Sequence, residues 1–219
     1  IEDQHFKKDH APELIAKKLL RINLSDLAAM GATPYGFFLN IALPKKIIHQ
    51  WLTEFVKGLK TDMSLFNLKL FGGDLSNSSK IFLNATILGK TIKKTYNKNV
   101  ATENSSIYVS GKIGDAALGF QIKNKFPYID INISNDERDY LMNKFMLPQP
   151  RIKTGKNLNG LVDFCTDISD GLFRELFMIT HQSNLQANIF LEKIPISNVI
   201  KRLINTDKTN SKKMWEMIL

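Results

Sequence analysis

The sequence holds a single cysteine, Cys165, among its 219 residues. An internal disulfide is therefore excluded, and a cysteine-based zinc site lacks the ligands it needs. No apolar run approaches the roughly 18 residues that a membrane-spanning helix requires. With 43% hydrophobic residues, the chain is also too apolar for intrinsic disorder. We therefore expect a globular, cytoplasmic protein with no membrane partner.

Arginine is scarce as well, with five residues among the 30 that are basic. The net charge of +9 could indicate a polyanionic partner. The lysines, however, are spread along the chain in doublets, whereas basic segments that bind nucleic acids are runs of about five to eight residues. We interpret the charge as a solvated lysine-rich surface. A nucleic-acid binder remains the less favoured alternative.

Several familiar catalytic motifs are missing. Gly89-Lys90-Thr91 ends like a P-loop, but Asn84 stands where that motif requires its first glycine. The four histidines form no His-Glu-x-x-His pattern, and no Gly-x-Ser-x-Gly segment is present. A Walker-type site, a zinc protease and a serine hydrolase of that type are therefore excluded.

Hydrophobic spacing predicts alternating helices and strands, which is typical of the α/β or α+β class. Helices are expected over residues 11–31, 47–66, 115–126, 135–145, 151–158, 169–182 and much of 197–219. Strands are expected over residues 35–43, 68–71, 81–89, 107–109 and 187–191. The polar stretch 93–106 lacks periodicity, so we place a domain boundary there, between residues 1–94 and 95–219.

Three short acidic motifs remain, and they contain Asp26, Asp74, Asp167 and Asp170. Aspartates without neighbouring His or Cys suit Mg²⁺, which takes one or two carboxylates and completes its shell with water and substrate phosphates. Asp26 falls in an otherwise apolar helical stretch, where a carboxylate is costly to bury unless it is paired or bound to metal. The motifs thus indicate nucleotide chemistry.

Each motif also has a purely structural interpretation. Asp26 could lie on a solvated helix face, and the glycines of Gly72-Gly73-Asp74 could simply form a turn after a strand. Asp167 could cap the following helix, because an acid stands three residues later, as in a capping box. The residue pattern alone leaves these alternatives open.

Taken together, the motifs resemble one family closely. The run from Asn23 to Pro34, followed by Gly72-Gly73-Asp74 and by 167–172, resembles thiamine-monophosphate kinase, of the aminoimidazole-ribonucleotide-synthase-like superfamily. The His5-Phe6 pair and the segment 148–151 match that family too. The resemblance implies a two-domain α/β (α+β) fold whose N-terminal sheets form a homodimer.

The resemblance also implies an activity: ATP-dependent phosphorylation of thiamine monophosphate to thiamine diphosphate, with several Mg²⁺ ions and direct in-line transfer. Such chemistry depends on charge neutralisation and alignment more than on a protein nucleophile. Carried over by motif, His5 contacts the substrate phosphate, whereas Asp26 and Asp170 act in catalysis. Metal ligands are Asp26, Asp74, Asp167 and Asp170, and ATP contacts are Gly73, Asp74, Lys98 and Ser169.

The chain departs from the family pattern in places. Leu75 stands where a threonine is usual, and Lys98 replaces an arginine, which keeps the charge but loses the planar fork. Family segments expected before Ile1 and after Leu219 are not in the sequence, so we expect a piece of a longer protein that is catalytically incomplete by itself. The alternatives are a non-catalytic nucleotide-binding remnant and a sister enzyme of the superfamily with another substrate.

Overall fold

The computed structural model describes residues 1–47, 49–91, 96, 101–123, 133–162, 164–206 and 211–219. Contacts divide the chain into two compact units, which we call unit 1 (Ile1–Tyr96 and Gln149–Cys165) and unit 2 (Asn97–Pro148 and Thr166–Leu219). The domain division predicted from the sequence places a single boundary near residue 95. It did not foresee that 149–165 packs with the first unit, and the assignment of domains stays a prediction.

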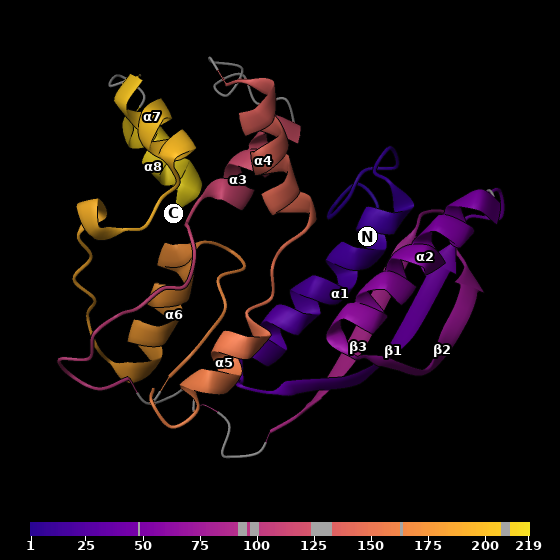
Figure 1. Ribbon diagram of the computed structural model, residues 1–219, viewed down its shortest axis with the longest axis horizontal. Coiled ribbons are helices and arrows are strands. Elements are labelled where there is room, and N and C mark those ends of the chain that lie inside the picture. The colour runs from indigo at the N-terminus through magenta and orange to yellow at the C-terminus, as the bar shows by residue number, and fades with distance from the viewer. Residues whose placement is uncertain (48, 92–95, 97–100, 124–132, 163, 207–210) are drawn as a thin grey trace. The chain divides into compact units, whose positions relative to one another are not determined.

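Unit 1 combines three helices with a three-stranded sheet (Figure 1). The helices are α1 (Pro12–Ala29), α2 (His49–Phe66) and α5 (Ile152–Leu158), and the strands are β1 (Thr33–Leu43), β2 (Lys69–Asn77) and β3 (Phe82–Lys90). The strand order is β2-β1-β3, with β1 parallel to β2 and antiparallel to β3. All six elements were predicted, although β2 is longer than expected.

Helix α1 begins and ends where its sequence dictates. Pro12 occupies the first turn, where the missing N–H costs nothing. Gly31 follows the helix at a φ of 65°, a left-handed conformation that glycine adopts without steric cost. One side of α1 buries Leu20 and Leu24 in the core of unit 1. Burying each such side chain is worth about 2 kcal/mol.

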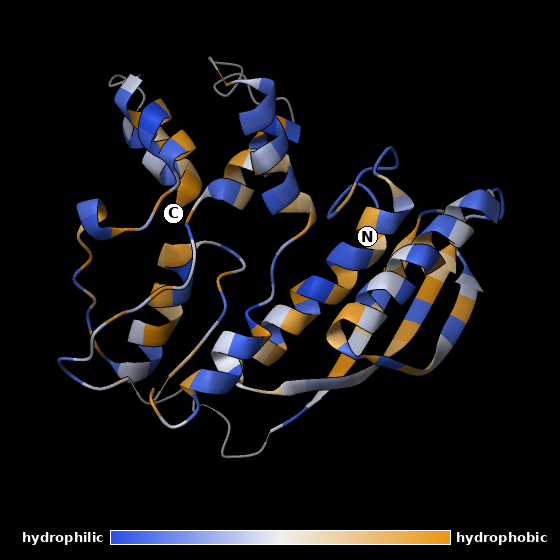
Figure 2. Cartoon of the chain, viewed as in Figure 1, coloured by the Kyte–Doolittle hydropathy of each residue, from blue (hydrophilic) through white to orange (hydrophobic). Residues whose placement is uncertain are grey.

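The sheet has one buried and one exposed face, because side chains alternate along each strand. Phe37 and Leu39 of β1 are buried in the core with the helices, whereas Phe38 and Asn40 are exposed. Figure 2 shows this as hydrophobic bands interrupted by hydrophilic ones along the strands. The exposed face also carries Phe82, paired with Ala42 in the register of β1 and β3.

Unit 2 is helical in its described part. Its elements are α3 (Asp115–Lys123), α4 (Asn135–Met146), α6 (Leu172–Ser183), the short 3-10 helix η1 (Leu191–Lys193), α7 (Asn198–Thr206) and α8 (Ser211–Ile218). Leu118, Leu141 and Ile200 are wholly buried at its core. Ser134 and Glu137 form a capping box at the start of α4, which stops the helix from fraying.

Two strands predicted for unit 2 are wrong. Residues 107–109 and 187–191 form no strand, and the described part of the unit contains only an isolated parallel bridge, between Ile113 and Ile196. A short apolar stretch becomes a strand only when a neighbouring backbone pairs with it, and that partner is not a local property of the sequence. The mixed α/β class is nevertheless confirmed by unit 1. None of the helices in the described ranges is long and apolar enough to cross a bilayer.

Helices α1 and α2 are joined by a buried ion pair. The Arg21 guanidinium donates from Nε to Asp62 Oδ2 at 2.6 Å and from its second nitrogen to Oδ1 at 3.0 Å. Asp62 is wholly buried, and Arg21 is only 7% exposed. The Phe66 ring lies 5.6 Å from the guanidinium carbon. The pair therefore fixes α1 against α2 in one orientation.

We expect Asp62→Ala to lower the free energy of unfolding by about 3–5 kcal/mol, because it leaves the Arg21 charge buried without its partner. Urea denaturation followed by circular dichroism measures the change. The double variant Arg21→Met with Asp62→Leu is the control, since replacing both charges by apolar groups costs little. Equal losses in the two variants would contradict the expectation.

Candidate functional site

Asp26 lies on α1, three residues before the helix ends at Ala29. Its side chain is exposed, whereas Leu24 and Ala28, two positions before and after it, are buried on the other side of the helix. Asp26 therefore lies on an exposed side of the helix, as in the structural alternative that the sequence had left open. An exposed carboxylate is accessible to a hydrated cation, so its role as a metal ligand stays a prediction.

The Gly72-Gly73-Asp74 motif lies within β2 and does not form a turn. Gly73 pairs with Leu39 of β1, and a Cβ at Gly73 would come 1.8 Å from the Leu39 carbonyl oxygen. Only glycine fits where the two backbones approach so closely. Asp74 is exposed and pairs with Asn40, so it belongs to the exposed face of the sheet. The strand continues to Asn77 because β1 offers it a backbone partner throughout.

His5 lies in the segment that precedes α1. Phe6 is buried in the core of unit 1 and holds this segment down. The His5 imidazole is exposed, and its Nδ1 lies 3.1 Å from the Ile1 amino group. Partial burial lowers the pKa of His5, and the nearby positive charges of the N-terminus and Lys18 lower it further. A neutral His5 can donate one N–H to an anionic ligand.

Lys18 is a residue that our sequence analysis treated as part of the solvated surface. It lies on α1 and is half-buried, and burial lowers the pKa of its ammonium group to about 8. Its spacing could have drawn attention to it, because Lys18, Ile22 and Asp26 recur at intervals of four residues. That interval places all three on one side of a helix.

The remaining acidic motif lies in unit 2, before α6. Helix α6 begins at Leu172 after Gly171, and no side chain caps it, so the alternative that Asp167 caps this helix is wrong. Ser169 Oγ donates to Glu175 at 3.3 Å, and Asp170 lies 3.4 Å from Arg174 Nε. Ser169 and Asp170 are exposed and Asp167 is half-buried.

The structure groups the expected site residues by unit. Unit 1 holds His5, Asp26, Gly73 and Asp74, and unit 2 holds Asp167, Ser169 and Asp170. Within the described ranges, no three His, Cys, Asp or Glu side chains gather closely enough to hold a metal ion. Lys98 lies outside the described residues. The metal, ATP, substrate and catalytic roles of these residues stay predictions.

The sequence and the fold of this chain are similar to those of a known class of proteins. Residues 1–91 match the N-terminal domain of AIR synthase related proteins. The crystal structure of thiamine monophosphate kinase from Aquifex aeolicus superimposes with a TM-score of 0.88 at 24% identity, covering all of this chain and 72% of that one. The fold is therefore that of the AIR synthase-like proteins, as the resemblance implied.

Sequence relatives then identify the family. The thiamine-monophosphate kinase of Leptospira interrogans is 32% identical over 99% of this chain and 71% of its own length. The Buchnera aphidicola enzyme from the strain APS is 35% identical over 91% of this chain. This chain spans only 61% of the Buchnera enzyme. The chain belongs to the thiamine-monophosphate kinase family.

We expect Gly73→Ala to destabilise unit 1 by about 2 kcal/mol, because the added methyl group collides with the Leu39 carbonyl and pushes β2 away from β1. Thermal unfolding measures the loss. Ser76→Ala, at an exposed position of the same strand, is the matched control and should leave the midpoint unchanged. Equal midpoints for both variants would show that the two strands tolerate a side chain at position 73.

Proposed function

We propose that this protein phosphorylates thiamine monophosphate to thiamine diphosphate at the expense of ATP. The observation that carries the proposal is the 32% identity to the Leptospira thiamine-monophosphate kinase over nearly the whole chain. A related kinase, AaThiL, has been solved with AMPPCP and TMP. AMPPCP is an ATP analogue, so that complex supports both ATP and thiamine monophosphate as substrates here.

We assign the metal-binding role to Asp26, Asp74, Asp167 and Asp170. The exposed carboxylates of Asp26, Asp74 and Asp170 fit a hydrated Mg²⁺, because oxygen ligands that leave room for water and phosphate are what this ion prefers. When bound, Mg²⁺ supplies positive charge that shields the phosphates of ATP.

The chain's own residues orient the two reactants. Gly73 is exposed on the edge strand β2 and offers its backbone to a nucleotide, and the Ser169 hydroxyl offers a hydrogen bond to ATP. His5, neutral at pH 7, donates to the phosphate of thiamine monophosphate. With the attacking phosphate oxygen held in line with the γ-phosphate, transfer needs no covalent intermediate on the protein.

We also propose that the protein is a homodimer and acts in the cytoplasm. The exposed face of the sheet carries apolar side chains at Phe38, Phe82 and Leu88, which are 43%, 41% and 43% exposed. The register of β1 with β3 places the three on one face. Exposed apolar clusters of this kind are typical of protein interfaces. A second copy of the same sheet would cover them, as the family resemblance implies.

The kinase proposal is tested by measuring thiamine diphosphate formed from thiamine monophosphate, ATP and Mg²⁺ by the purified full-length protein. We expect turnover that Asp170→Asn lowers at least 100-fold, because losing a charged group at the reacting phosphates typically costs that much. The Asp170 pair with Arg174 is exposed, so its loss leaves the fold intact. Asp139→Asn, an exposed aspartate of α4, is the control. No turnover by the unaltered protein, or unchanged turnover by Asp170→Asn, contradicts the proposal.

The dimer is tested by sedimentation velocity. We expect the unaltered protein to sediment as a dimer and Phe38→Glu to sediment as a monomer, because a buried unpaired carboxylate at the interface is costly. Phe190→Glu introduces the same charge at an exposed aromatic residue of unit 2 and should leave the dimer intact. A monomeric unaltered protein would rule out the proposed interface.

A further inference from the structure

The segment before α1 folds into a tight turn that carries His5. The His5 backbone N–H donates to the Ile1 carbonyl at 3.0 Å. The Asp3 N–H donates to the Phe6 carbonyl at 2.8 Å. The His5 imidazole is exposed, whereas the next side chain, Phe6, is buried in the core of unit 1. The turn therefore presents His5 to solvent from a fixed point of the unit.

Asp3 adopts an unusual backbone conformation in this turn. Its φ is 68°, in the left-handed region that residues other than glycine seldom occupy. Such a conformation is unfavourable for a residue that carries a Cβ, and it persists only where surrounding contacts impose it. The turn of residues 1–6 therefore depends on contacts with the rest of unit 1.

Glu2 supplies these contacts by binding the chain just before β3. Its backbone N–H donates to the Ile81 carbonyl at 2.9 Å, and its carboxylate accepts from the Ile81 N–H at 2.9 Å. Glu2 is half-buried and Ile81 is buried. A hydrogen bond to a charged acceptor is strong, and partial burial strengthens it further. Glu2 thus ties the turn to the sheet through both its backbone and its side chain.

A second contact between the same two segments is weaker. Lys80 Nζ donates to Asp3 Oδ2 at 2.7 Å, but the two side chains are 57% and 54% exposed. Ion pairs this exposed contribute little, because water and salt screen them. The carboxylate of Glu2 is therefore the side-chain group that contributes most to holding the turn.

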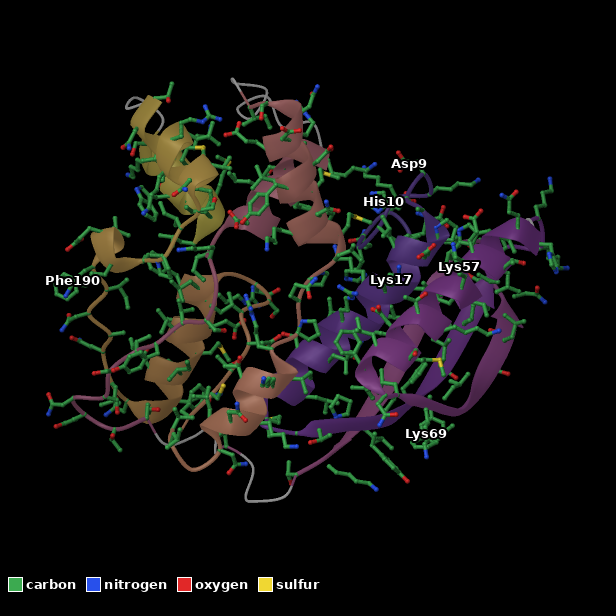
Figure 3. The ribbon with its side chains drawn as sticks, viewed as in Figure 1. Asp9, His10, Lys17, Lys57, Lys69 and Phe190 are labelled. Atoms are coloured by element: carbon green, nitrogen blue, oxygen red, sulfur yellow. The ribbon has the colours of Figure 1, made fainter. Side chains whose placement is uncertain are left out.

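The chain that follows the turn has anchors of its own. His10, labelled beside Asp9 in Figure 3, is buried with 7% of its surface exposed. At the start of α1, the Glu13 carboxylate lies 3.2 Å from Lys57 Nζ of α2. These contacts hold α1 in place whether or not Glu2 binds Ile81. A change at Glu2 is therefore expected to act on the turn and to leave the helix where it is.

We propose that Glu2 is a positioning residue for His5. Its bond to the Ile81 N–H fixes the turn, and the turn sets where the His5 imidazole meets the phosphate of thiamine monophosphate. This inference rests on the proposed kinase function and the role of His5 in it, and it deepens both by naming the group that orients this histidine. A donor that is already in place binds more tightly than one that the ligand must first order.

The experiment compares Glu2→Ala, which removes the acceptor, with Glu2→Gln, whose amide oxygen can still accept from Ile81. In the full-length protein we expect Glu2→Ala to raise the KM for thiamine monophosphate about 10-fold, because a displaced donor contributes little to binding. The KM for ATP should stay unchanged, and Glu2→Gln should restore most of the loss. Glu54→Ala removes another half-buried glutamate of unit 1, bonded to Gln50, and as the matched control should change neither KM.

A double-variant cycle separates positioning from a general effect on the fold. If Glu2 acts through His5, Glu2→Ala has no further effect on the KM for thiamine monophosphate once His5→Ala has removed the imidazole. Two independent contributions would multiply instead. The cycle therefore detects a coupling that a purely structural role of Glu2 would not produce.

Direct binding provides a measurement that does not depend on turnover. By calorimetry, Glu2→Ala should weaken the binding of thiamine monophosphate and leave that of thiamine, which has no phosphate, unchanged. Thermal unfolding checks that each variant folds. Glu2→Leu, which also accepts no hydrogen bond, replaces the alanine variant if that one does not fold.

The outcomes separate the two proposals. An active protein in which Glu2→Ala leaves the KM for thiamine monophosphate unchanged, or raises both KM values by the same factor, overturns the role of Glu2 alone. Multiplying effects in the double variant, or a Glu2→Gln variant as impaired as Glu2→Ala, overturn it too. An unaltered protein that neither converts nor binds thiamine monophosphate overturns the kinase function, and the role of Glu2 with it.

Discussion

The bidentate ion pair between Arg21 and Asp62 controls how α1 presents its side chains. Each residue along a helix is rotated by about 100°, so a small rotation of α1 would move one side chain into the place of another. The ion pair is buried and bidentate, so a rotation of α1 would break charge-assisted hydrogen bonds inside the protein. With α1 fixed in this way, its core side buries Leu24 while Asp26 stays in solvent.

A second constraint acts on the sheet. Strand β2 is exposed along nearly its whole length, so side-chain burial contributes little to its position. Its backbone pairing with β1 must hold it instead, and the absence of a side chain at Gly73 lets the two strands approach. The pairing of the sheet by itself therefore requires a glycine at position 73.

The elements of unit 1 could be predicted because their signals are local. The apolar spacing of α1 and α2 and the alternation in β1 are properties of short stretches, and turn residues such as Gly31 mark their ends. Strand pairing is not local, which is why β2 extends beyond its prediction and 187–191 forms no strand. The return of 149–165 to unit 1 likewise depends on contacts far away in the chain, such as the hydrogen bond that Tyr96 donates to the Gly155 carbonyl.

At the candidate site, too, a local motif does not reveal what distant contacts decide. The motifs around Asp26, Asp74 and Asp170 stand out in the sequence because aspartates cluster there with glycine and serine. Burial is not visible in a motif, and so the sequence left open whether Asp26 is buried, whereas the fold exposes it. Lys17 and Lys18 present the opposite case, since the sequence alone suggests that a lysine doublet is solvated, whereas the fold half-buries both residues.

Phosphoryl transfer between two anions gives a physical reason for this arrangement of charges. Metal ions held by aspartates can shield ATP, but carboxylates repel the acceptor phosphate wherever no cation lies between them. The Mg²⁺ ions of the proposed site must therefore shield the acceptor phosphate as well as ATP, and a neutral His5 could donate a hydrogen bond to that phosphate without adding charge.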